Sequence, residues 1–449
     1  GVADVGIVAG KIAAIASDIS PASAQEVVDA AGKVVMPGII DLHVHASAWL
    51  GGRFAHKMLA QAGVTTALDM AGPMDSVLDI AAAYGTGLNI ASIQYVRPEH
   101  TVRTDDPGEA ELRDLVERCL SEGALGVKLL GGHYPLTPDA TARAIEVANR
   151  LGAYVAFHAG TKKNGSNIAG FLEAVELAGG HALHVAHINS YCRGLVRPYM
   201  EEAEEAIAAL VAHPNIVSES YLSPLNGTSA KCSGGVPESL ATRNGGLKVG
   251  GFPPTEAGME AAILAGWAQI NMEAAGKVVL ATGREAVEYW RSRGTDTTVS
   301  FLVNPPEPRL RLAAAKRPSG GFVVDAISTD GGGIPRNVIL EMGLSLVKLQ
   351  VLTMQEFVLK ASRNPAAILG LGNKGHFRPG ADADVTVVDP AAQRAYMTVV
   401  DGRIVMCDGQ VFGTGGAIVT TAAGEATVRA RGLKAVVVGL AGSDFYRGR

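Results

Sequence analysis

Eight short apolar runs, separated along most of the chain by helix-like stretches, limit most strongly how this sequence can fold. The runs are rich in Val, Ile, Leu and Ala, as strands buried on both faces are. Stretches between them, such as "PGEAELRDLVERCLSEG", repeat apolar residues at helical spacing and end at Gly. The predicted strands are Gly38–Ala46, Val64–Met70, Leu88–Val96, Ala124–Leu130, Ala153–Ala159, Ala182–Asn189, Ile216–Leu222 and Gly321–Asp330. This alternation predicts an α/β fold, a (β/α)8 TIM barrel.

Other parts of the chain do not show this alternation of strand-like and helix-like stretches. Residues 1–36 and 372–449 contain short alternating strands joined by Gly and Asp-Gly turns, which predicts a small β-sandwich domain formed by both ends of the chain. The barrel is expected over residues 37–371. A long Gly-rich stretch separates the seventh predicted strand from the eighth, so an insertion is expected at about 225–320. Such insertions often form walls or lids of a site, and a purely structural excursion is the alternative.

Composition excludes several classes of function. The chain has 449 residues, of which 47% are hydrophobic and 18% charged, enough for a large core. Its 39 basic and 44 acidic residues are well mixed and give a net charge of −5, which provides no basic stripe for nucleic acid or for a membrane surface. No apolar run approaches the ~18–20 residues of a membrane span. Four cysteines without paired spacing fit a reducing, cytoplasmic location, and a small-molecule substrate is expected.

Polar side chains gather at the carboxyl ends of the predicted strands, where barrels of this kind carry their sites. In "IIDLHVH", His43 and His45 share one face of a strand and can close on one metal ion. Further candidates on other strands are Lys128, His158, His184, His187 and Asp330. A lone histidine at a strand end is usually structural, but no structural need explains so many ligating side chains at one rim. The sequence therefore predicts a metal site there.

Three of these candidates need separate arguments. His184 and His187 fall on opposite faces of one predicted strand, so only one should point inward, and His187 is preferred because it lies nearer the strand end. Lys128 lies in an apolar run, where burial should lower its pKa toward neutrality. A neutral amine can be carboxylated by CO2, and the carbamate could bridge two cations. A lysine that is ion-paired or reaches the surface is the alternative.

Taken together, these motifs resemble the amidohydrolase superfamily, specifically the hydantoinase, dihydroorotase and N-acyl-D-amino-acid deacylase group. The matching segments cover nearly the whole chain: "PGIIDLHVH", Lys128, "FHAG", "HVAHINS", "STDGGG" and "RPGADADVTVVD". The resemblance implies a binuclear centre. Its implied ligands are His43, His45 and Asp330 on one ion, His158 and His187 on the other, and N-carboxylated Lys128 between them. Zn²⁺ is the ion expected, while Mn²⁺, Co²⁺ and Fe²⁺ are compatible with these ligands.

The resemblance also implies roles in catalysis. A hydroxide that bridges the two ions would attack the amide carbonyl, and Asp330 would pass its proton to the leaving nitrogen. Hydantoinases place a tyrosine five residues after the bridging lysine. Here His133 occupies that position and Tyr134 follows it, so either could donate to the oxyanion, or neither. Lys162, Lys163 and Arg193 follow the predicted ligands and could bind a substrate carboxylate, although exposed bases need no ligand.

The expected function is hydrolysis of a C–N bond in an amide, with cyclic amides of hydantoin, dihydropyrimidine or lactam type ahead of N-acyl amino acids. An N-acyl-D-amino-acid deacylase is the first alternative, because "GALGVKLLGGHYPLTPD" and the glycines after Asp330 resemble that branch. A mononuclear deaminase and a catalytically inactive scaffold are the others. All six implied ligands are present, which argues against a scaffold. A homo-oligomer, dimer or tetramer, is expected from the relatives.

Overall fold

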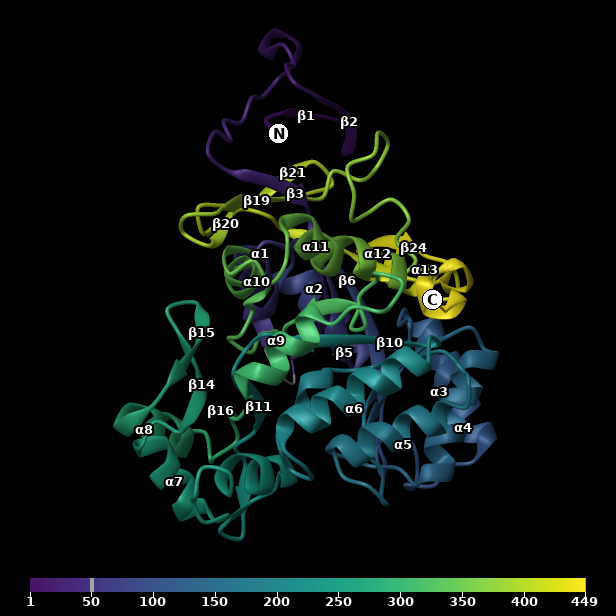
Figure 1. Ribbon diagram of the computed structural model, residues 1–449, viewed down its shortest axis with the longest axis vertical. Helices are drawn as coiled ribbons and strands as arrows, with labels where there is room; N and C mark the ends of the chain where they lie inside the picture. The colour runs from purple at the N-terminus through teal and green to yellow at the C-terminus, as the bar shows by residue number, and fades with distance from the viewer. Residues whose placement is uncertain (49–51, 449) are drawn as a thin grey trace.

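A closed barrel of eight parallel strands forms the centre of the computed structural model, which describes residues 1–48 and 52–448 (Figure 1). Each strand pairs with the next one along the chain. The eighth strand is interrupted at Thr329 and Asp330, and its two parts pair with the seventh and the first strand. The barrel strands are β4 (Ile39–His45), β5 (Val64–Ala71), β6 (Thr86–Val96), β7 (Gly126–Leu130), β8 (Tyr154–His158), β9 (Leu183–Val185), β10 (Ile216–Tyr221), β17 (Ala326–Ser328) and β18 (Gly331–Gly332). The predicted (β/α)8 barrel is confirmed.

Helices cover the outside of the barrel and alternate with its strands. They are α1 (Ala55–Gln61), α2 (Met74–Tyr84), α3 (Glu109–Glu122), α4 (Pro138–Arg150), α5 (Ile168–Ala178), α6 (Tyr199–Ala212), α9 (Pro306–Ala314), α10 (Ile339–Lys348), α11 (Met354–Val358) and α12 (Asn364–Ile368). Local sequence sets their ends: the Thr137 hydroxyl accepts a bond from Ala140 N to cap α4, and α3 ends at Gly123 with a φ of 110°. Within the described ranges, no helix is long and apolar enough to cross a membrane.

The two ends of the chain meet in the predicted β-sandwich. One layer is an antiparallel sheet in the order β22 (Gln410–Val411), β21 (Arg403–Cys407), β20 (Arg394–Val400), β19 (Val385–Asp389) and β3 (Val34–Pro37). The other is the hairpin of β1 (Asp4–Val8) and β2 (Lys11–Ala16). Ile12 of the hairpin is fully buried and packs in one cluster with Val385, Val387 and Met397. Apolar contacts between the two layers therefore hold the sandwich together.

The last part of the chain lies elsewhere than the sequence suggested. The segment with β23 (Gly415–Thr420), α13 (Glu425–Ala430) and β24 (Lys434–Val437) packs on the barrel, and it is followed by α14 (Asp444–Arg447). β23 pairs in parallel with the amino-terminal half of β6, whereas β7 pairs with β6 only from Gln94 onward. The long strand β6 thus leaves an edge open, and β23 covers it.

An additional α+β unit stands beside the barrel between β10 and α9 (Figure 1). Its antiparallel sheet has the order β11 (Leu225–Ser229), β16 (Thr298–Leu302), β14 (Ala268–Ala274) and β15 (Lys277–Ala281), next to the short pair β12 (Cys232–Ser233) and β13 (Val236–Pro237). Helices α7 (Glu256–Leu264) and α8 (Gly283–Ser292) enclose a separate core that contains Trp290 and Phe301. We call residues 225–303 the inserted domain.

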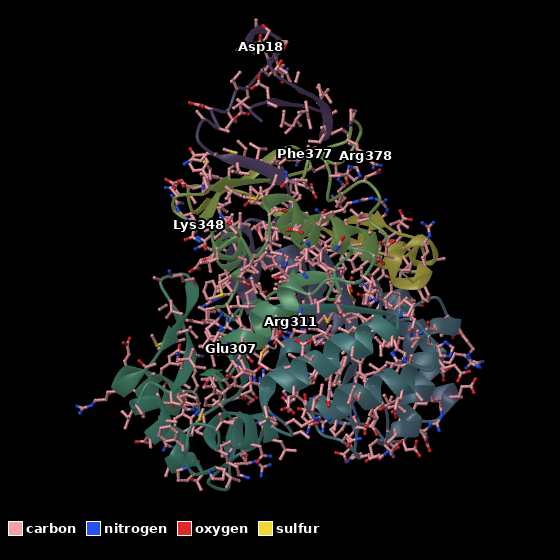
Figure 2. All side chains as sticks on the ribbon, viewed as in Figure 1. Asp18, Glu307, Arg311, Lys348, Phe377 and Arg378 are labelled. Atoms are coloured by element: carbon pink, nitrogen blue, oxygen red, sulfur yellow. The ribbon has the colours of Figure 1, made fainter. Side chains whose placement is uncertain are left out.

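The inserted domain ends earlier than the predicted boundary near 320, because α9 belongs to the barrel. α9 packs against α6 in the helical layer, and Arg311 of α9 pairs with Glu204 of α6 at 2.6 Å. Figure 2 labels Glu307 and Arg311 on this helix. The helix thus serves as the ordinary connection between the seventh and eighth strands of the barrel.

Helix α1 carries a buried histidine that should make the fold acid-sensitive. Neither ring nitrogen of His56 has a hydrogen-bond partner among the described residues, and burial lowers its pKa from 6.5 to about 4. Below pH 6.5 the unfolded chain therefore binds a proton that the folded chain excludes, and the unfolding free energy falls as the pH drops toward 4.

Wild type should lose unfolding free energy as the pH falls from 6.5 to 4, and we expect His56→Leu to remove about 3 kcal/mol of that loss. The unfolding free energy would be measured in denaturant across this pH range, with the exposed His213→Leu as the control that keeps the wild-type dependence. An unchanged pH dependence in His56→Leu would contradict the prediction.

Candidate metal centre

Three predicted ligands meet where the first and eighth barrel strands end. Asp330 Oδ1 lies 2.9 Å from His45 Nε2 and 3.3 Å from His43 Nε2. One ligand atom from each residue lies within 4.8 Å of the other two. Two ligands bound tetrahedrally to one Zn²⁺ at about 2.0–2.1 Å are about 3.3 Å apart, so this spacing fits a shared cation. Burial would raise the pKa of Asp330, but Arg336, His43 and His45 outweigh it and hold the pKa well below its usual range.

Two further predicted ligands lie where the neighbouring strands β8 and β9 end. His187 Nε2 is 3.1 Å from His158 Nδ1, which is again the spacing of two atoms on one ion. Burial lowers the pKa of both imidazoles well below the usual value, so both are held in the neutral form that binds metals. This pair adjoins the first three ligands, because the rings of His43 and His187 stack at 5.2 Å between centroids.

The structure places His187, and not His184, beside His158. His184 Nδ1 lies 2.6 Å from the hydroxyl of Tyr154, which stacks on Phe445 of α14. β9 ends at Val185, and His187 follows in a left-handed conformation with a φ of 38°. The turn after the strand, and not the alternation along it, therefore aims His187 at the centre.

Lys128 points into the barrel among these groups. Its side chain is buried on β7, and Nζ lies 3.0 Å from Met70 Sδ. Burial lowers the pKa of Lys128 to about 8, although the nearby charges of Glu219 and Asp330 act to raise it. An amine with this pKa is partly neutral near physiological pH, as the predicted carboxylation requires.

Glu219 of β10 is part of the centre and was not among the residues predicted from the sequence. It is fully buried, and Oε1 lies 2.7 Å from His43 Nδ1 and accepts a bond from His187 N at 2.6 Å. Ser328 donates to its other oxygen. One carboxylate thus orients a histidine of each ligand set and leaves His43 Nε2 free to face Asp330. An acidic residue inside the buried run "IVSESY" was the available signal.

We expect Glu219→Gln to weaken Zn²⁺ binding by about 10- to 100-fold, because a neutral amide oxygen holds the N–H groups of His43 and His187 more weakly than the charged Oε1 that contacts both. Affinity would be measured by competition with a chromophoric chelator. Glu202→Gln is a matched control, since Glu202 is equally buried but binds the backbone of residues 194–197 instead of the centre. Equal affinities in wild type and Glu219→Gln would contradict this role.

Of the two oxyanion candidates, His133 lies beside a predicted ligand. Its ring is 5.2 Å from that of His158. Tyr134 instead lies under the guanidinium of Arg97 at 4.2 Å and packs on the apolar cluster that includes Tyr95. The loop before them passes directly over His158, where a Cβ at position 132 would meet His158 Nε2 at 2.0 Å, so only glycine fits.

The three predicted carboxylate-binding cations differ in their partners. Lys162 pairs with Asp105 at 2.9 Å, and Lys163 lies 3.8 Å from Glu173. Arg193 binds neutral groups: Asn304 Oδ1 at 2.8 Å, and the hydroxyls of Ser190 and Tyr221 at 3.1 Å. Within the described part of the chain, no carboxylate pairs with Arg193, which leaves its charge available to a ligand.

The sequence matches the model of the Amidohydrolase family over residues 34–228 and 310–412, and the chain belongs to this family. The unmatched stretch between these ranges corresponds closely to the inserted domain. The prediction of a metal-dependent hydrolase of the hydantoinase, dihydroorotase and deacylase group, acting on C–N bonds, is confirmed.

Individual relatives differ in what they are named for. A dihydroorotase of Pelotomaculum thermopropionicum is 28% identical over 86% of this chain and 84% of its own length. A D-aminoacylase of Alcaligenes xylosoxydans is 24% identical over 87% and 84%. The crystal structure of an N-acyl-D-glutamate deacylase from Bordetella bronchiseptica, complexed with zinc and a phosphonate inhibitor, shares the fold with a TM-score of 0.65 at 16% identity, over 92% of this chain and 94% of the other.

Proposed function

We propose that this protein hydrolyses the C–N bond of a small amide at a binuclear metal centre. The ligands are His43, His45 and Asp330 for one ion, His158 and His187 for the second, and carboxylated Lys128 for both. One observation carries the proposal: two pairs of ligand atoms, each at the spacing of one shared cation, lie side by side with a buried, partly neutral amine among them. Zn²⁺ is the proposed ion, because the set combines histidines with carboxylates.

The residues of the centre divide the work of the reaction. Divalent ions held by these residues would supply an ionised water and a polarised substrate carbonyl near neutral pH. Lys128 Nζ forms an N–C bond with CO2, a C–O π pair moves onto oxygen, and the amine releases one proton to solvent. The carboxylate of Asp330 accepts the proton of the attacking water and returns it to the leaving nitrogen. His133 donates a hydrogen bond to the carbonyl oxygen of the substrate.

The substrate class follows from Arg193 and from the relatives. A guanidinium whose partners among the described residues are all neutral suits a substrate carboxylate. A cyclic amide of hydantoin, dihydropyrimidine or lactam type is the first candidate, supported by the likeness to the dihydroorotase. An N-acyl-D-amino acid is the second, supported by the likeness to D-aminoacylase and to the deacylase structure.

A substrate screen with metal analysis tests the proposal. Protein loaded with Zn²⁺ or Mn²⁺ would be assayed on carboxylate-bearing hydantoins, dihydropyrimidines and lactams and on N-acyl amino acids, each beside an analogue that lacks the carboxylate. We expect hydrolysis of a carboxylate-bearing amide and about two metal ions per chain. One ion per chain together with deamination would favour a mononuclear deaminase, and metal binding without any turnover would favour a scaffold.

A further inference from the structure

Arg336 is a buried cation in direct contact with the metal centre, and the proposed reaction does not use it. Its side chain is 2% exposed, and Nη2 lies 2.5 Å from Asp330 Oδ2. Nε donates to the backbone carbonyl of the same Asp330 at 2.6 Å. Two donors of one planar group thus hold both the side chain and the main chain of one residue, a grip that an ammonium cannot reproduce.

The backbone of Asp330 is in an uncommon conformation, which these two contacts from Arg336 help to hold. Its φ is 52°, in the left-handed region, where the eighth strand breaks between β17 and β18. Its amide donates to His43 O at 2.8 Å, which fixes the main chain on one side. The remaining freedom is rotation of the carboxylate, and Arg336 removes it by binding Oδ2. Oδ1 is then the oxygen that faces His43 and His45.

The third contact of Arg336 is with a residue outside the barrel. Nη1 donates to Leu225 O at 3.1 Å, and Leu225 is the first residue of β11 in the inserted domain. A Cβ at Gly227, two residues further along β11, would lie 3.4 Å from Arg336 Nη2. Repulsion between a guanidinium and divalent cations makes this an unfavourable place for an arginine unless its geometry is needed.

We propose that Arg336 is a positioning residue that aims Asp330 at the metal site, and that the inserted domain sets the metal affinity through this arginine. The inference rests on the proposed role of Asp330 as a ligand. It gives the inserted domain a function in the centre, although none of the predicted metal ligands lies within residues 225–303.

Arg336→Lys separates the effect of the positive charge from the effect of the guanidinium geometry. The variant keeps the charge but loses the planar set of donors that holds Asp330. We expect Arg336→Lys to bind Zn²⁺ about tenfold more weakly than wild type in chelator competition. Arg317→Lys is the matched control, because Arg317 also donates to backbone carbonyls but lies beneath the barrel at the end of α6, and its affinity should stay at the wild-type value. Wild-type affinity in Arg336→Lys, or an equal loss in Arg317→Lys, would overturn the role of Arg336.

A second variant tests the link from the side of the inserted domain. Gly227→Val adds bulk against Arg336 without altering any group at the centre, and we expect Zn²⁺ affinity to fall about threefold or more. Gly245→Val, in the same domain with open space around it, should leave the affinity unchanged. Wild-type affinity in Gly227→Val would overturn the link. If wild type itself binds no Zn²⁺, the proposed function fails, whereas normal binding that these variants do not change refutes this inference alone.

Discussion

Lys128→Met is expected to lower kcat by about a thousandfold or more and to reduce the metal content from about two ions per chain to about one. Methionine is unbranched and nearly as long as lysine but cannot form a carbamate. Without the proposed bridge the two ligand sets lose the group that would span them, and repulsion between two cations at close range is no longer offset. Turnover of the substrate found in the screen and metal content by mass spectrometry would be measured on the same samples.

Lys360→Met is the matched control for this prediction. Lys360 is also fully buried, and burial lowers its pKa to about 7, but its amine donates to Val324 O, outside the centre. The control should keep its metal ions and its kcat, so a loss specific to Lys128 cannot be ascribed to removing a buried amine in general. Full activity and two ions in Lys128→Met would show that no carbamate bridge exists.

The barrel could be predicted because a local sequence pattern identifies each of its strands. Runs such as Ala153–Ala159 are mostly apolar and are bounded by helical periodicity, so pattern alone locates them. Eight strand–helix units are the number that closes a parallel sheet into this barrel. The C-terminal segment went elsewhere than expected because its partner, the edge of β6 near Thr86, lies far away in the sequence. Alternating apolar residues specify a strand but not the sheet that it joins.

The candidate site divides in the same way. His43, His45 and Asp330 could be named from the sequence, because the carboxyl ends of barrel strands all meet at one rim. Glu219 and Arg336 could not, since their roles depend on pairings across 176 residues to His43 and on a loop conformation at Asp330. Residues that can bind a metal are therefore easier to identify from the sequence than residues that orient those ligands.

Asp330→Asn is expected to lower kcat by about 10²- to 10⁴-fold, the range attributed to a general acid and base. The amide cannot take up a proton and return it, and its single carbonyl oxygen cannot both accept from Arg336 and face His45. The loss should therefore appear in kcat more than in KM. The measurement is steady-state kinetics on the substrate found in the screen, with metal content determined in parallel so that loss of the ions is seen separately.

Asp325→Asn provides the control at the opposite end of the same strand. Asp325 is equally buried, and its Oδ2 accepts a bond from Ser218 N, a contact that an asparagine oxygen can keep. We expect wild-type kcat in this variant, because the amino end of a barrel strand carries stability and not catalysis. If Asp330→Asn retained its metal ions and turned over at the wild-type rate, the proton would have to move through another group. His133 would then be the next residue to replace, since it lies beside His158.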